Sequence, residues 1–250
     1  MSNKNNIINT RSENSEDLTK KERKVLRTKK IILDAARELF SEKGFDLVSM
    51  QEIADLAALS RATLYNYFNT KEEIYFNIGL SKIEDWIEQY NALDSTNYSG
   101  KKLVIFLAEN LVKDILEFPF YSRLLRRFFY RSIELNLPIQ DIFYSSMIEK
   151  KEIQEISKFD AQNKIFFDLL DAYINYRQLW KNSIEIGVKD GSILSTSNLI
   201  HLNFFLIMSI FGLLDQIDFR RSLMKMVNLS NKEITNFILR LTSKFLEGEI

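Results

Sequence analysis

Glycine and proline are so scarce in this chain that they limit the folds open to it. The 250 residues include 7 glycines and 2 prolines, far below the roughly 7% and 5% that are typical of proteins. β-Sandwiches, barrels and doubly wound sheets need many tight turns, and these two residue types form such turns most easily. We therefore expect an all-α chain of about nine to ten helices.

The residue types that carry most catalytic and metal chemistry are almost missing. The chain has no cysteine and one histidine, which excludes disulfides, thiol catalysis and Cys-based metal sites and argues against a multi-His site. No glycine-rich phosphate loop is present. We expect no enzyme activity, no cofactor and no metal, although a pair of catalytic carboxylates is compatible with this sequence. Because 34 basic residues balance 34 acidic ones, only local charge can indicate a partner.

Neither the most polar stretch of the chain nor the most apolar one is predicted to be a targeting or membrane segment. Residues 1–18 are rich in Asn and Ser, lack the apolar region of a signal peptide, and are expected to form a disordered tail. Residues 199–214 are strongly apolar but interrupted by polar side chains, which favours a buried or interface helix over a membrane span. We expect a cytoplasmic protein without a membrane partner.

Helix starts are marked by a Ser or Thr followed three residues later by Glu, the capping-box pattern. The pattern occurs at Thr19–Glu22, Ser49–Glu52, Thr70–Glu73 and Ser230–Glu233. Apolar periodicity then predicts helices over about 20–43, 50–57, 61–68, 71–91, 101–117, 120–136, 139–156, 161–189, 198–217 and 231–247. We divide the chain into a tail (1–18), a small head (19–70) and a large helical domain (71–250).

The head has the pattern of a helix-turn-helix: two short helices separated by a tight turn and braced by a longer helix before them. In such a unit the second short helix enters the major groove of DNA. Its expected core consists of Ile32, Leu39, Phe40, Phe45, Ile53, Leu56, Leu64 and Phe68. This core leaves Arg61, Ala62, Thr63, Tyr65, Asn66 and Tyr67 facing outward.

The head also resembles the TetR family (TetR/AcrR-like) of transcriptional regulators. The resemblance rests on the Ile-Ala pair at 53–54, the Ser-x-x-Thr-Leu-Tyr-x-Tyr-Phe run at 60–68, the Lys-Glu pair at 71–72, and the upstream run at 31–45. It covers about residues 28–75. Ala58 departs from the pattern, since the family usually has Gly in that turn. The resemblance implies a homodimeric, DNA-binding regulator whose larger domain senses a small molecule and releases DNA.

Individual side chains of the head suit contacts with DNA. A guanidinium at Arg61 can bind guanine in bidentate fashion, and Thr63, Tyr65, Asn66 and Tyr67 can donate to phosphates. Lys71 lies in the first turn of a helix, where phosphate is favoured, and Ser49 is a further candidate. Each also has a purely structural interpretation: Arg61 as a solvated arginine near a cap, Tyr67 as a packing residue, and Ser49 as a cap only.

A basic run precedes the helix-turn-helix. Residues 20–30 contain seven basic side chains against Glu22 alone, a local charge of +6. Such a run favours phosphate attraction and steering, although it is also compatible with a solvated helix start.

Residues from about 98 onward hold 15 of the 19 phenylalanines, enough rings to line a pocket for a lipophilic or aromatic effector. Aromatic residues at helical spacing are also common in a plain core, and an arginine cluster can be a solvated face. The candidate ligand contacts are Arg126, Arg127, Phe128, Phe129, Tyr173 and Trp180.

Two apolar segments, 197–217 and 231–247, are expected to pair with their counterparts in a second copy as a four-helix dimer interface. We interpret the chain as a ligand-responsive repressor that binds an inverted-repeat operator. Two alternatives stay open: a related DNA-binding protein that activates or acts on machinery away from promoters, and a helical interaction module without DNA function.

Overall fold

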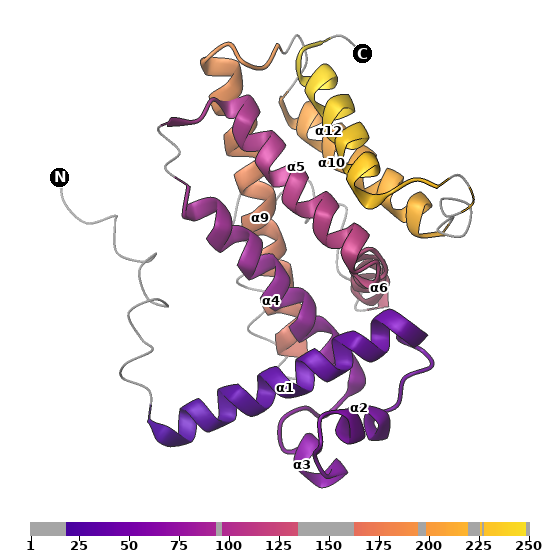
Figure 1. The fold of residues 1–250 in the computed structure, drawn as a ribbon. Helices are drawn as coiled ribbons and strands as arrows, with labels where there is room; N and C mark the ends of the chain where they lie inside the picture. Colours follow the sequence, from indigo (N-terminus) through magenta and orange to yellow (C-terminus); the bar gives the residue numbers. More distant parts are fainter. Residues whose placement is uncertain are drawn as a thin grey trace, which may run out of the picture. The chain divides into compact units, whose positions relative to one another are not determined.

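The computed structural model describes residues 19–93, 97–134, 163–194, 199–219, 226 and 228–248. Within these ranges all the long regular elements are α-helices and no strand occurs (Figure 1), which confirms the all-α prediction. The expected tail (1–18) and the helix expected at 139–156 lie outside the described residues. The chain divides into two compact units, residues 1–74 and 75–250.

The first unit consists of α1 (Lys20–Lys43), α2 (Met50–Leu56), α3 (Arg61–Tyr65) and the first residues of α4 (Lys71–Asn91). Helix α2 packs against both α1 and α3. The side chains that hold these short helices together are 0–2% exposed, and burial of such apolar surface is the main stabilising contribution in a small unit. They are Ile32, Ala36, Phe40, Val48, Ile53, Ala54, Leu64, Phe68 and Ile74.

Two details of the predicted head are wrong. Leu56 was expected in the core but is 45% exposed, because Ile53 and Ala54 set the buried face of the short α2 and Leu56 falls outside it. The recognition helix was expected to reach Phe68 but ends at Tyr65. Beyond it, the N–H of Tyr67 bonds to the carbonyl of Leu64 at 2.9 Å, a tighter turn than an α-helix makes.

Three of the four expected capping boxes are complete, at the starts of α1, α2 and α12 (Asn231–Leu246). At the start of α4 the box is half formed. The Thr70 hydroxyl accepts from the N–H of Glu73 at 3.0 Å, but the Glu73 carboxylate accepts from the N–H of Asn69, one residue before the expected donor.

The second unit is arranged around α5 (Gly100–Glu117), which packs against α6 (Phe120–Glu134), α9 (Lys164–Lys189), α10 (Leu199–Phe219) and α12 (Figure 1). Helix α5 can have this many neighbours because apolar side chains occupy most of its circumference. Residues Leu103, Val104, Leu107, Ala108, Leu111 and Val112 are each at most 1% exposed.

Backbone contact without side chains fixes the start of α5 against α9. A Cβ atom on Gly100 would lie 1.9 Å from the backbone nitrogen of Gly187, so α5 can carry no side chain at this crossing. A Cβ atom on Gly187 would instead lie 2.4 Å from the side chain of Ile193. The carboxylate of Asp190 accepts from the N–H of Gly100 at 2.8 Å. Nearby, the hydroxyls of Tyr90 and Ser183 form a 2.8 Å hydrogen bond between α4 and α9.

Helices α10 and α12 each bury one face and expose another. On α10, Leu206 and Ile210 are buried within the chain, whereas Met208 is 48% and Leu213 39% exposed. On α12, Ile238 is buried and Phe237 is 59% exposed. Among the described helices none is long and apolar enough to cross a membrane.

Candidate nucleic-acid interface

The short helix α3 presents the polar side chains that the sequence places on the recognition helix. Ser60 caps it, since its hydroxyl accepts from the N–H of Thr63 at 3.0 Å. Leu64 is fully buried and anchors the helix to the core. Opposite this anchor, Arg61, Ala62, Tyr65 and Asn66 are exposed, while Thr63 and Tyr67 are half-buried.

Arg61 and Tyr65 form a pair on the exposed face of α3. They are four residues apart, the spacing that brings helix side chains together. The guanidinium lies 5.5 Å from the centre of the Tyr65 ring, and its Nη2 donates to the Tyr65 hydroxyl at 3.4 Å. The contact holds the arginine over a ring while its remaining donors stay available to a base edge or phosphate.

The turn before α3 adopts a backbone conformation that ordinarily favours glycine. Ala58 has a φ of 54°, in the left-handed region. The turn is closed by hydrogen bonds from the N–H of Leu59 to the carbonyl of Ala54 at 2.9 Å and from the N–H of Ala58 to that of Asp55 at 3.1 Å. These two backbone hydrogen bonds hold Ala58 in its strained conformation.

Ser49 and its neighbour Glu52 link α1 to α2. The Ser49 hydroxyl accepts from the N–H of Glu52, whose carboxylate accepts in turn from the hydroxyl and N–H of Ser49 at 2.8 Å. The same carboxylate forms an ion pair with Lys43 at 2.6 Å. The Lys43 ammonium, together with the two Ser49 donors, lowers the pKa of Glu52 to about 2.

Lys71 has a structural role that the sequence does not predict. Its ammonium donates to the carbonyl oxygens of Phe45 and Val48, both at 2.7 Å, and to that of Asp46 at 3.3 Å. It also lies 4.4 Å from the centre of the Phe45 ring. Because these acceptors occupy the side chain, the predicted phosphate contact through the Lys71 ammonium would require it to leave the loop between α1 and α2.

The basic run lies on the first turns of α1. Six of its seven basic side chains are exposed, and Lys29 is half-buried with its ammonium 5.8 Å from the centre of the Phe68 ring. The exposed members are Lys20, Lys21, Arg23, Lys24, Arg27 and Lys30.

The candidate ligand residues of the second unit differ in burial. Arg126 is exposed and Arg127 half-buried, and the side chain of Phe129 lies outside the described ones. Phe128 is a core residue, 1% exposed and stacked on Phe166 with ring centres 4.7 Å apart. Trp180 is fully buried, and Tyr173 lines a cavity.

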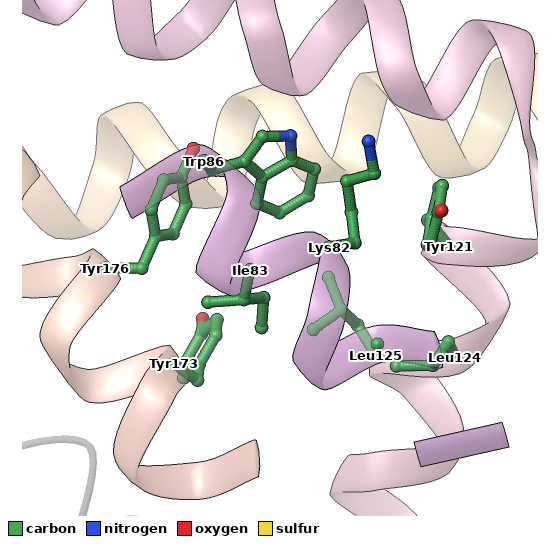
Figure 2. A pocket seen from close by; sticks show the side chains of 9 residues that line it. Lys82, Ile83, Trp86, Tyr121, Leu124, Leu125, Tyr173 and Tyr176 are labelled. Carbon is green, nitrogen blue, oxygen red and sulfur yellow. The ribbon is translucent and has the colours of Figure 1, made fainter. Parts of the chain in front are cut away.

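That cavity lies between α4, α6 and α9 (Figure 2). Its free volume is about 10 Å³, room for about one water molecule. The sequence prediction missed its other lining residues, although the helical spacing of Tyr173 and Tyr176 is a signal that they share a face. These residues are Gly79, Lys82, Ile83, Trp86, Tyr121, Leu124, Leu125 and Tyr176.

Comparisons with known sequences show which protein family the first unit resembles. The family model described as "Bacterial regulatory proteins, tetR family" matches residues 32–78. The transcriptional repressor KstR2 of Rhodococcus jostii (strain RHA1) is 25% identical over 165 residues, which cover 66% of this chain and 67% of KstR2. The regulator UidR of Escherichia coli (strain K12) is 45% identical over 85 residues, 34% of this chain and 41% of UidR. The match therefore spans less than half the length of UidR.

Solved structures share the fold of most of the chain. FadR from Bacillus subtilis, solved in complex with stearoyl-CoA, has a TM-score of 0.55 at 16% identity, with 86% of this chain and 98% of that one covered. A tetR-family protein from Rhodococcus RHA1 has a TM-score of 0.58 at 15% identity, with 88% and 97% covered. At these identities the likeness shows a common fold and nothing more specific.

Proposed function

This chain belongs to the TetR family of DNA-binding transcriptional regulators, which are not enzymes, and on that premise we propose that it is a ligand-responsive repressor acting as a homodimer on an inverted-repeat operator. The observation that carries the proposal is the exposed face of α3. Arg61, Tyr65 and Asn66 project from a helix that Leu64 anchors in the core, as a helix that reads the major groove requires.

The proposed DNA contacts divide into two kinds. Arg61 contacts a guanine edge, and Thr63, Tyr65, Asn66 and Tyr67 contact phosphates or a neighbouring base. The exposed basic side chains at the start of α1 add attraction that does not depend on sequence. Ser49 and Lys71 contribute through the α1–α2 loop that they stabilise, whether or not they touch phosphate.

A second copy of the chain is proposed to cover the exposed face of α10 and α12. The groove between these helices has a free volume of about 160 Å³ and an almost wholly apolar lining that includes Leu213, Leu241 and Phe245. Next to it, Met208 and Phe237 are about half exposed. Pairing this face with its symmetry mate buries it and gives a two-fold protein, which matches an inverted repeat with half-sites separated by whole turns of DNA.

Release of DNA is proposed to follow from binding of an effector in the second unit. KstR2 is named a repressor, and Bacillus subtilis FadR has been solved with stearoyl-CoA bound. These facts support a repressor that responds to a small molecule. An effector that binds one arrangement of the bundle more tightly than another shifts the population toward that arrangement. In this proposal the two arrangements differ in DNA affinity, so effector binding changes the affinity for DNA.

Selection from a random pool of DNA duplexes tests the proposal. Purified full-length protein should enrich an inverted repeat, bind it as two chains per duplex, and lose affinity steeply as salt rises. Placed over a promoter, the enriched site should reduce transcription in vitro when the protein is added. Absence of DNA binding at low salt would instead support the helical interaction module, and increased transcription would support an activator.

A further inference from the structure

Four residues of α4 form one wall of the cavity between α4, α6 and α9. They are Gly79, Lys82, Ile83 and Trp86, at the i, i+3, i+4 and i+7 positions that share one face of a helix. No polar atom of the described residues is exposed to the cavity, so Lys82 lines it with the hydrocarbon part of its side chain. Because these residues form a whole wall, the cavity stays closed only while α4 remains in place.

The polar ends of two of these residues meet at a single carboxylate oxygen on α5. The indole N–H of Trp86 donates to Oδ2 of Asp114 at 2.5 Å, and the ammonium of Lys82 lies 3.3 Å from the same atom. Both nitrogens lie on the same side of α4 (Figure 2). Lys82 is one turn before Trp86, so Asp114 binds two successive turns of the helix. We call these three residues the Asp114 clamp.

The Asp114 clamp has little access to water. The side chains of Asp114 and Lys82 are 21% and 17% exposed, and Trp86 is 4% exposed. A carboxylate that has lost most of its hydration depends on its donors, and hydrogen bonds to a charged acceptor are stronger than those between neutral groups. Lys82 also pairs with Asp85 at 3.8 Å, but within its own helix. Separating α4 from α5 would therefore remove two donors from Asp114 at once, which favours the closed arrangement.

Aromatic contacts connect the clamp to the other walls of the cavity. The ring centre of Trp86 lies 5.2 Å from that of Tyr176 on α9 and 6.4 Å from that of Tyr121 on α6. The ammonium of Lys82 lies 5.9 Å from the centre of the Tyr121 ring. Trp86 thus contacts α5, α6 and α9, and its displacement would change every wall of the cavity.

Resting on the DNA-binding function proposed above, we propose that Asp114 is a positioning residue, which holds α4 against α5 and thereby favours the arrangement that binds the operator. In this arrangement the cavity has room for about one water molecule, too little for an effector. In the proposed repressor the effector-free arrangement binds DNA, so the arrangement with the closed cavity is the DNA-binding one. The first residues of α4 belong to the first unit, so the same helix carries a change at the clamp to the helix-turn-helix.

Asp114→Asn tests the proposal, because it keeps an oxygen for the Trp86 N–H but loses the charge that binds Lys82. Without any effector, affinity for the selected operator should fall fivefold or more, the range typical of coupling between sites. Asp190→Asn is the matched control: its carboxylate joins the end of α9 to the N–H of Gly100, and its loss should leave operator affinity unchanged. Equal losses in the two variants would mean that Asp114 acts only through general stability and would overturn the proposal.

A second variant tests the clamp from its other side. Lys82→Met retains the hydrocarbon that lines the cavity and removes the ammonium that Asp114 binds. It should lower operator affinity by about the same factor as Asp114→Asn. The double variant should bind no more weakly than either single one, because both remove the same contact. Losses that multiply in the double variant would overturn the proposal.

Quenching of Trp86 fluorescence by acrylamide measures the clamp without DNA. In a Trp180→Phe background, Trp86 is the only tryptophan of the chain. Adding Asp114→Leu, which removes both contacts, should raise the quenching rate constant at least twofold as α4 separates from α5. Adding Asp190→Asn should leave it unchanged. An unchanged rate constant with Asp114→Leu would overturn the proposal, since α4 would then be held in place without the clamp.

The two measurements separate failure of this inference from failure of the proposed function. If the wild-type protein binds the operator and Asp114→Asn binds it equally well, the proposed function stands and the positioning role is wrong. If the wild-type protein binds no duplex, the proposed function fails, and with it the role of Asp114 in DNA binding. Increased quenching with Asp114→Leu would in that case still support a clamp on α4.

Discussion

The ammonium group of Lys71, at the start of α4, lies 2.7 Å from the carbonyl oxygen of Val48, just before α2 begins. It donates at the same distance to Phe45, at the other end of the loop between α1 and α2. One charged side chain thereby satisfies backbone acceptors that a loop without regular structure would leave to water.

Replacing Lys71 by Met should therefore destabilise the first unit by about 2 kcal/mol, the typical contribution of hydrogen bonds to a charged group. Chemical unfolding of the two proteins measures the difference. If Lys71→Met unfolds like the wild type but loses DNA affinity, the lysine acts on phosphate and the loop contacts are incidental.

Ala58→Gly should stabilise the protein by about 0.5–1 kcal/mol, because glycine adopts the φ of 54° without the steric cost that alanine carries. Ala62→Gly is the matched control within α3, where a helical glycine should cost about 1 kcal/mol. Thermal unfolding at neutral pH distinguishes the two. A melting temperature lowered by Ala58→Gly would contradict a strained turn.

Arg61→Lys keeps the charge but loses the bidentate donors and the contact with the Tyr65 ring. Affinity for the selected operator should fall by about 1–3 kcal/mol, and preference at one base pair should relax. Lys24→Ala should instead weaken binding to all duplexes alike and reduce the salt slope by about 1. Gel-shift titrations at several salt concentrations give both quantities, and identical effects of the two variants would exclude base reading by Arg61.

The lowered pKa of Glu52 predicts how stability depends on pH. A carboxylate whose pKa in the folded state is about 2, below its ordinary 4.5, stabilises the fold above pH 4.5 and loses that contribution as pH falls toward 2. Glu52→Gln should flatten the acid side of the stability curve in this window, and Glu38→Gln, at an exposed position of α1, should not. Urea unfolding between pH 2 and 6 measures both, and parallel curves for wild type and Glu52→Gln would refute the assignment.

Phe237→Asp should convert the proposed dimer to a monomer, because it places a charge on an apolar face that pairing would bury. Light scattering should give twice the chain mass for the wild type and the single mass for the variant. Leu47→Asp is the control: Leu47 is 77% exposed in the first unit and its replacement should leave the mass unchanged. A monomeric wild-type protein would remove the basis for an inverted repeat.

Local signals in the sequence predicted the local structure well. Caps and apolar spacing located the starts of α1, α2, α3 and α4, because each depends on residues within one helical turn. The exposed face of α3 followed in the same way from the burial of Leu64. Leu56 was misplaced because a helix of only seven residues makes too few turns for its period to define a face.

The features that sequence reasoning missed depend on long-range contacts. The acceptors of Lys71 lie 23 to 26 residues before it, and nothing in the first turn of α4 indicates them. Likewise, Asp114 joins Trp86 from a different helix, 28 residues along the chain. Only the packing of the helices reveals that these groups meet.

The bare crossing of Gly100 and Gly187 also determines how the second unit can deform. Because the two backbones are in contact there, we expect that α9 cannot slide along its axis against α5 unless the two helices separate. If α9 moves to open the cavity, we expect it to turn about this crossing, so that its displacement grows toward Phe166 near the other end of the helix.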